Sequence, residues 1–216
     1  LSGIEAAPTI QLVADGSIPA NTPVLVGSDG KAKTIVGYAN EMGSEIVVSA
    51  DADTATASIQ IAEDLETGRV VYLWRNNSVS PQSTYYRVGT RSGTTVTWGT
   101  GATLCGNPCA GGDTQIVCIG TDKFFAIYMD WEDHVYCRVI STTSSNTATL
   151  GTRVVMTDSS NNNLSSVVYP QLQFDSVSGN IMMAYGQPSG GNSGLQARMA
   201  SVSGTTVTLG SPVRIT

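Results

Sequence analysis

The chain has 216 residues, a formal net charge of −6 and only 13% charged residues. A pI of about 4.6 argues against binding of a polyanion through bulk charge, so nucleic acid is not an expected partner. No apolar run approaches the eighteen or so residues of a membrane-spanning helix, so we expect no insertion into a membrane.

Hydrophobic residues make up 41% of the chain, enough to bury a sizeable core. The abundance of Thr, Val and Gly favours strands and turns over helices. The composition therefore indicates an ordered, β-rich protein.

Residues 1–43 are interpreted as a small β module or attachment arm. Its expected strands are the apolar segments 10–14, 18–26 and 33–36, which are separated by the turn sequences Asp15-Gly16 and Asp29-Gly30. This pattern predicts a short antiparallel meander that precedes the rest of the chain.

Residues 44–216 contain one sequence pattern three times. Each copy has an apolar run ending in an aromatic residue, then an Arg, and about a dozen residues later a Thr-rich segment ending in Gly. The apolar runs are 70–74, 124–128 and 181–185, the arginines are Arg87, Arg138 and Arg198, and the glycines are Gly99, Gly151 and Gly210. Several features that recur in one order indicate a structural repeat.

Each copy is predicted to form four strands. A polar strand (58–62 or 169–174 in two of the copies) leads into the apolar run, whose lack of charge suits a strand buried on both faces. The Arg-bearing strand follows, and a tight turn joins it to the Thr-rich strand as a hairpin. The sequence therefore predicts an all-β fold: a small N-terminal β module, then propeller-like repeats of four-stranded antiparallel sheets.

Three units, at about 44–99, 100–151 and 152–210, are fewer than the four blades of a closed propeller. The segment 211–215 matches the opening of the third unit at 152–156, and it is interpreted as the start of a fourth unit. Because the chain begins at Leu1 rather than at Met, we expect the natural chain to extend beyond both ends. The alternative is a propeller that is incomplete in one chain and is completed by pairing with another copy.

The four cysteines, Cys105, Cys109, Cys118 and Cys137, lie within one third of the chain. Cys105 and Cys109 flank the turn sequence Gly-Asn-Pro, so one alternative is a disulfide between them, and the other is free thiols. A zinc site would need tighter pairs and more than the single His134. We predict no metal and no cofactor.

The three recurring arginines have two interpretations. One is a ring of basic groups around a ligand. The other, which we favour, is that each Arg pairs with a neighbour or packs its stem along its own sheet.

Two sets of residues are weak candidates for ligand binding. The loop Asp130, Trp131, Glu132, Asp133 and His134 combines carboxylates with an aromatic ring, but it lacks the spacing of an EF-hand, and a solvated loop is the simpler interpretation. Trp98, like Trp131, has no aromatic counterpart in every unit, which makes it a candidate for stacking on a sugar. We find no catalytic motif and predict no enzyme.

The clearest copy of the repeat, VSGNIMMAYGQPSGGNSGLQARMASVSGTTVTLGSPVRI at 177–215, resembles tandem repeats of tailed-phage virion proteins, particularly fibre-like appendages. The N-terminal stretch LVADGSIPANTPVLVGSDGKAKTI similarly resembles short β modules at the start of phage structural proteins. The resemblance covers most of residues 10–216, and the middle unit departs from it most.

The resemblance implies a structural component of a phage virion, most simply a tail fibre or other appendage, that acts in assembly and in recognition of the host surface. The implied partners are copies of itself (a homo-oligomer, with a trimer as one candidate), other virion proteins and host surface glycans. The alternatives are a capsid decoration protein and a secreted propeller-type carbohydrate-binding protein or glycosidase. The expected location is the virion, outside the cell.

Overall fold

The computed structural model describes residues 24–26, 31–34, 59–76, 83–105, 114–129, 135–156, 168–187 and 194–215. The chain divides into two compact units, Leu1–Gly43 and Ser44–Thr216. In the first unit, β1 (Val24–Val26) and β2 (Ala32–Thr34) form an antiparallel pair.

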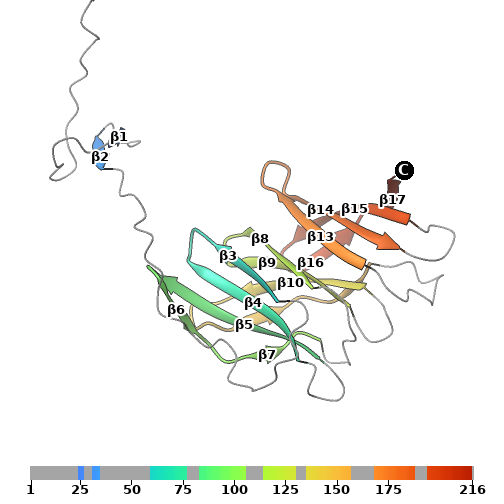
Figure 1. Cartoon of the computed structure of the whole chain (residues 1–216), viewed down its shortest axis with the longest axis horizontal. Coiled ribbons are helices and arrows are strands. Elements are labelled where there is room, and N and C mark those ends of the chain that lie inside the picture. The colour runs from blue at the N-terminus through green and yellow to red at the C-terminus, as the bar shows by residue number, and fades with distance from the viewer. Residues whose placement is uncertain are drawn as a thin grey trace, which may run out of the picture. The chain divides into compact units, whose positions relative to one another are not determined.

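The second unit contains three sheets of the same construction (Figure 1). The first sheet consists of β3 (Gln60–Asp64), β4 (Arg69–Asn76), β5 (Ser83–Ser92) and β6 (Thr95–Trp98). The second consists of β8 (Gln115–Gly120), β9 (Lys123–Met129), β10 (Val135–Thr142) and β11 (Ala148–Leu150). The third consists of β13 (Val168–Asp175), β14 (Asn180–Gln187), β15 (Gly194–Ser203) and β16 (Thr206–Leu209).

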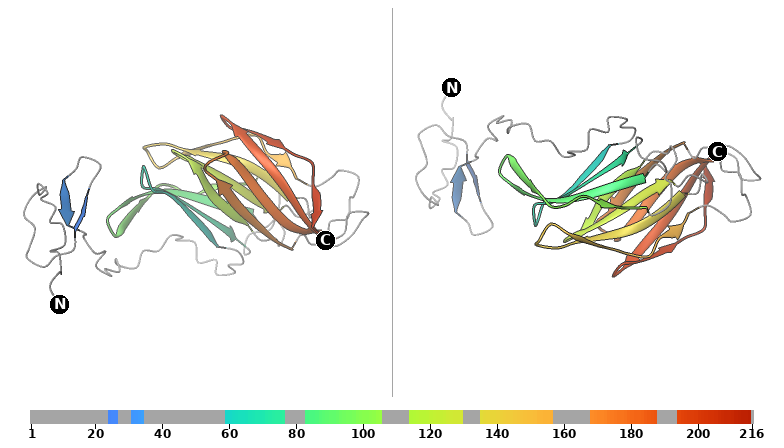
Figure 2. Two further views of the ribbon diagram at one scale, coloured as in Figure 1. Left: turned by 90° about the horizontal axis from the view of Figure 1, so that it is seen from above. Right: turned by 90° about the horizontal axis from the view of Figure 1, so that it is seen from below.

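These sheets confirm the predicted all-β fold class and the propeller-like repeat. Within each sheet the four strands pair antiparallel in chain order, and every element in the described part of the chain is a strand or a turn. Strand contacts join the first sheet to the second and the second to the third, so the three described sheets follow one another without closing into a ring (Figure 2).

The hairpin turns lie where the sequence predicts them. Gly93 and Gly204 have φ angles of 58° and 63°, and Asn146 has a φ angle of 58° at the corresponding turn of the second sheet. Glycine and asparagine are the residues that adopt this left-handed conformation most readily. These three positions therefore explain the Ser-Gly or Ser-Asn that recurs before each Thr-rich strand.

A short fifth strand completes the outer edge of each sheet. After β6, β7 (Ala102–Thr103) pairs with the same strand, β5, further along its length. The second sheet takes in β12 (Val154–Val155) and the third takes in β17 (Val213–Ile215) in the same way. The segments that the sequence analysis assigns to the openings of the third and fourth units thus pair with the sheets before them.

Two hydrophobic clusters hold the three sheets together. The first cluster lies between the first and second sheets and joins Val71 to Phe124, whereas the second lies between the second and third sheets and joins Phe125 to Ile181. Phe124 and Phe125 are neighbours on β9 whose side chains point to opposite faces. The middle sheet is therefore buried on both sides, as the uncharged run predicts. The row runs from the first sheet to the third. The side of each sheet that faces in this direction is its front face, and the opposite side is its back face.

At each outer edge, the recurring glycine lies at the break between the fourth and fifth strands. A Cβ atom on Gly99 would come closer than 3.0 Å to the backbone oxygen of Asn146, and one on Gly151 would come closer than 3.0 Å to that of Thr205. Both contacts are made by the hairpin turn of the following sheet. Because real Cβ atoms essentially never approach an oxygen so closely, only glycine fits at these two positions.

Candidate functional site

The three recurring arginines make the same hydrogen bond. Nε of each donates to the carbonyl oxygen of the recurring glycine in its own sheet: Arg87 to Gly99 at 2.6 Å, Arg138 to Gly151 at 3.0 Å and Arg198 to Gly210 at 2.5 Å. This bond satisfies a carbonyl at the break in the edge strand.

Two of these arginines also tie their sheet to the preceding one. Nη1 of Arg138 donates to the carbonyl oxygen of Leu104, just after β7, at 2.8 Å. Nη1 of Arg198 donates to the carbonyl oxygen of Met156, just after β12. The arginines thus pair with neighbouring backbone, as the favoured interpretation holds.

Asp64 forms a second link between the first two sheets. Its carboxylate is buried at the end of β3 and accepts hydrogen bonds from the Thr67 hydroxyl at 2.7 Å, the Glu66 amide at 3.0 Å and the Asp122 amide at 2.8 Å. Asp122 belongs to the turn between β8 and β9. Burial raises the pKa of Asp64, but these hydrogen bonds lower it by more, so the pKa lies below its ordinary value.

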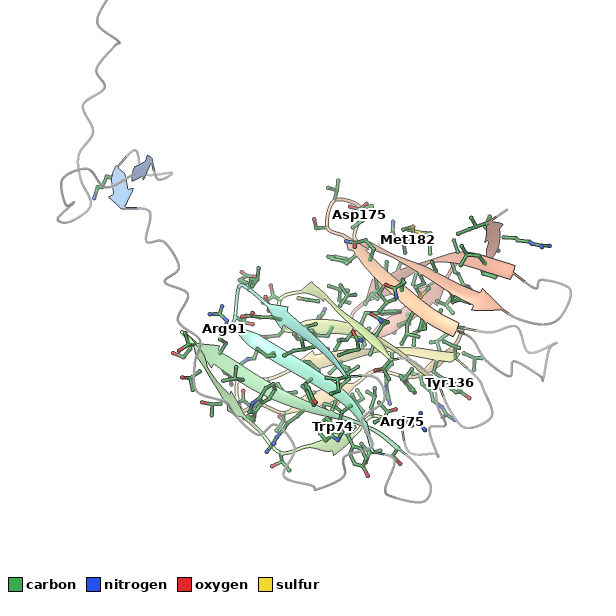
Figure 3. The ribbon with its side chains drawn as sticks, viewed as in Figure 1. Trp74, Arg75, Arg91, Tyr136, Asp175 and Met182 are labelled. Atoms are coloured by element: carbon green, nitrogen blue, oxygen red, sulfur yellow. The ribbon has the colours of Figure 1, made fainter. Side chains whose placement is uncertain are left out.

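The front face of the third sheet is an apolar surface. Among the exposed large hydrophobic residues in the described part of the chain, five lie on this face: Met182, Leu195, Met199, Val213 and Ile215. Figure 3 shows Met182 on β14, on the side away from the other two sheets. Contiguous apolar surface of this kind marks interaction sites in soluble proteins. The sequence analysis missed this face, although its apolar residues stand at repeat positions that are core positions in the first two sheets.

The back face of the first sheet carries a group of aromatic rings, and it includes the candidate Trp98. The rings of Tyr72 and Trp98 are 6.2 Å apart in an edge-to-face arrangement, and Trp74 stacks on Tyr85 at 5.6 Å. The ring of Trp98 lies over Gly89, where any Cβ atom would overlap it. Trp98 is half-buried, so part of its ring remains open to solvent.

A hollow of about 340 Å³ lies on the same back face. Its lining consists of Ile61, Ala62, Glu63, Val70, Arg91 and Val96. The charged groups of Arg91 and Glu63 form an ion pair there. The back face thus combines aromatic rings, apolar wall and one pair of charges that can exchange hydrogen bonds with a polar ligand.

The remaining predicted site residues lie outside the described residues. These are Asp130, Trp131, Glu132, Asp133 and His134 of the acidic loop, and Cys109, which one of the two alternatives pairs with Cys105 in a disulfide. Cys105 is buried at the end of the first sheet's outer edge. Cys137 is fully buried in the second cluster, and burial raises the pKa of its thiol to about 12. Cys137 therefore packs as a small apolar residue.

No protein-family model matches this sequence, and no curated protein matches it. In the described ranges, no helix is long and apolar enough to cross a membrane. Those ranges also contain no group of three or more His, Cys, Asp and Glu residues placed to hold a metal ion. The function is therefore inferred from the contacts set out above.

Asp64→Asn is expected to weaken the packing of the first sheet on the second. In either orientation the amide would place its NH2 group against a backbone N–H, that of Asp122 or that of Glu66, and we expect a loss of about 1–3 kcal/mol in the free energy of unfolding at pH 7. Because the folded-state pKa is lowered, this contribution is present above the ordinary aspartate pKa of about 3.9 and is lost as the pH falls through the folded-state value. Urea unfolding between pH 3 and pH 7 measures both effects.

Asp175→Asn is the matched control. Asp175 accepts the same two bonds within its own turn, from Val177 and Ser178, and it is exposed. It makes no bond to a neighbouring sheet among the described contacts, so its variant should unfold close to the parent curve. Equal losses in the two variants would contradict a role for Asp64 between sheets.

Proposed function

We propose that this chain is a non-enzymatic structural component of a tailed-phage virion, specifically a tail fibre or other appendage protein that acts through assembly. The observation that carries the proposal is the role of the recurring residues: each recurring Arg binds the carbonyl of the recurring Gly in its own sheet, and Arg138, Arg198, Gly99 and Gly151 also contact a neighbouring sheet. A row of sheets built by one repeated contact suits a scaffold.

The resemblance of 177–215 to repeats of phage appendages supports the same proposal. The proposed partners are other copies of the chain and other virion proteins, and the proposed location is the virion surface. A capsid decoration protein is the alternative within this class, because it would use the same kind of self-association.

Antibody labelling of purified virions tests this proposal. We expect gold particles at the tail or its appendages in negative-stain images, and peptides of this chain in the mass spectrum of the washed virions. Labelling on the head would replace the appendage by a decoration protein. Absence of the chain from virions that are otherwise complete would contradict the proposal.

Recognition of host glycans is a second candidate function, and the aromatic back face of the first sheet favours it. A half-buried ring such as that of Trp98 can stack on the apolar face of a sugar, and the Arg91–Glu63 pair that lines the hollow offers donors and acceptors for hydroxyl groups. A secreted carbohydrate-binding protein would use the same surface.

Trp98→Leu is expected to lower the affinity for a host polysaccharide by about tenfold, the equivalent of about 1.4 kcal/mol of lost stacking. Leu is the matched choice because Leu150 and Leu209 occupy the corresponding positions of the other two sheets. A glycan array followed by calorimetry measures the change, with Val177→Ala in a distant turn as control. Unchanged binding in the Trp98→Leu variant would exclude this face as the glycan site.

A further inference from the structure

We propose that the front face of the third sheet binds the back face of the first sheet in a second copy of this chain, head to tail. The inference rests on the proposed assembly function and names its partner and its surfaces. It uses the same contact that already joins the three sheets within one chain.

Corresponding residues of the three front faces show that, among the described residues, no further sheet packs on the third face. At one position the exposed fraction of the side chain is 0% for Val71, 0% for Phe125 and 49% for Met182. At two further positions the same comparison gives 1% for Val88, 0% for Val139 and 45% for Met199, and 1% for Leu104, 1% for Met156 and 46% for Ile215. The third sheet thus keeps apolar side chains at positions that the first and second sheets bury against the next sheet.

One position on the back face of the first sheet shows the complementary pattern. Ile61 on β3 is 60% exposed, whereas Ile116, at the corresponding position of the second sheet, is 8% exposed in the first cluster. Leu172 occupies this position in the third sheet and packs against the second cluster. At this position the first sheet presents apolar surface where its two counterparts are packed, whereas Val70 and Trp74 on the same face are buried. Figure 3 shows Trp74 and Met182 on opposite sides of the row of sheets.

The glycine contact gives the proposed interface its direction. Gly99 and Gly151 each receive the hairpin turn of the following sheet, but the atoms nearest to a Cβ on Gly210 belong to Met199 of its own sheet, and Gly210 is exposed. In the first sheet, the hairpin turn that corresponds to the turns of Asn146 and Thr205 contains Thr94, which is exposed. The turn at Thr94 of a second copy is the segment that fits the edge at Gly210.

Such an interface joins two different surfaces, so each added copy leaves one surface of each kind open. Interfaces of this type give rings where the rotation closes and filaments where it does not. A second copy is therefore expected to add three further sheets to the row.

Sedimentation of the 216-residue chain over a range of concentrations tests the proposal. We expect species at multiples of 22.5 kDa. The double variant Met182→Asp with Met199→Asp on the front face, and the variant Ile61→Asp on the back face, should each sediment as single chains, with association at least tenfold weaker. These side chains are exposed in the single chain, so its circular dichroism should not change. A parent chain that stays single at every concentration would overturn the proposal.

Val155→Asp is the charge-matched control for Ile61→Asp, since this exposed side chain lies on β12 of the middle sheet and on neither of the two faces. It should associate as the parent does, and equal loss of association in the control would overturn the assignment of the faces. Mixing the front-face and back-face variants should restore two-chain complexes and nothing larger, because each variant keeps one intact face. Failure of the mixture to form pairs would contradict head-to-tail association.

The result is separate from the test of the proposed function. If the chain is found on virions but its self-association is unchanged by these substitutions, only the proposed interface is overturned. If the chain is absent from virions but still associates head to tail, only the proposed virion function is overturned.

Discussion

The close approach of a hairpin turn to a glycine is the contact on which the arrangement of the sheets depends. Gly99 and Gly151 lie where the outer edge of a sheet breaks, and the absence of a side chain lets the turn of the next sheet reach the backbone. This contact fixes how far apart neighbouring sheet edges lie. The packed cores between the sheets then follow, because side chains interdigitate only when the backbones are held at a suitable distance.

The arginines act at the same edge. Each one holds the carbonyl of the glycine in its own sheet, and Arg138 and Arg198 also reach the end of the edge strand in the preceding sheet. The hydrogen bonds of the charged arginines fix how one sheet is oriented on the next, whereas the apolar clusters bury most of the surface between the sheets. Together they give every sheet a distinct front and back, so the row has two different ends. The proposed head-to-tail assembly of copies relies on this polarity.

Much of this architecture could be predicted from the sequence. The four strands of each sheet and the turns at Gly93, Asn146 and Gly204 could be predicted because the hydrophobic pattern and the turn residues recur together in each copy. The pairing of the arginines with neighbours could be predicted because they recur at the same position of the repeat. The membership of β12 and β17 could not be predicted, since a short strand after a glycine fits the edge of either sheet equally well. The apolar front face at Met182 was hidden for a related reason: strand patterns show which side chains share a face, but not which face lacks a neighbour.

Urea unfolding of three glycine variants tests the central contact most directly. In dilute chain, Gly99→Ala and Gly151→Ala should each lower the free energy of unfolding by about 1–3 kcal/mol, because the added methyl group forces the turn of the next sheet away. Gly210→Ala should unfold close to the parent curve, since its nearest atom would lie 3.3 Å away within its own sheet. Equal losses at all three positions would show that the glycines serve their own sheets, and would contradict the account.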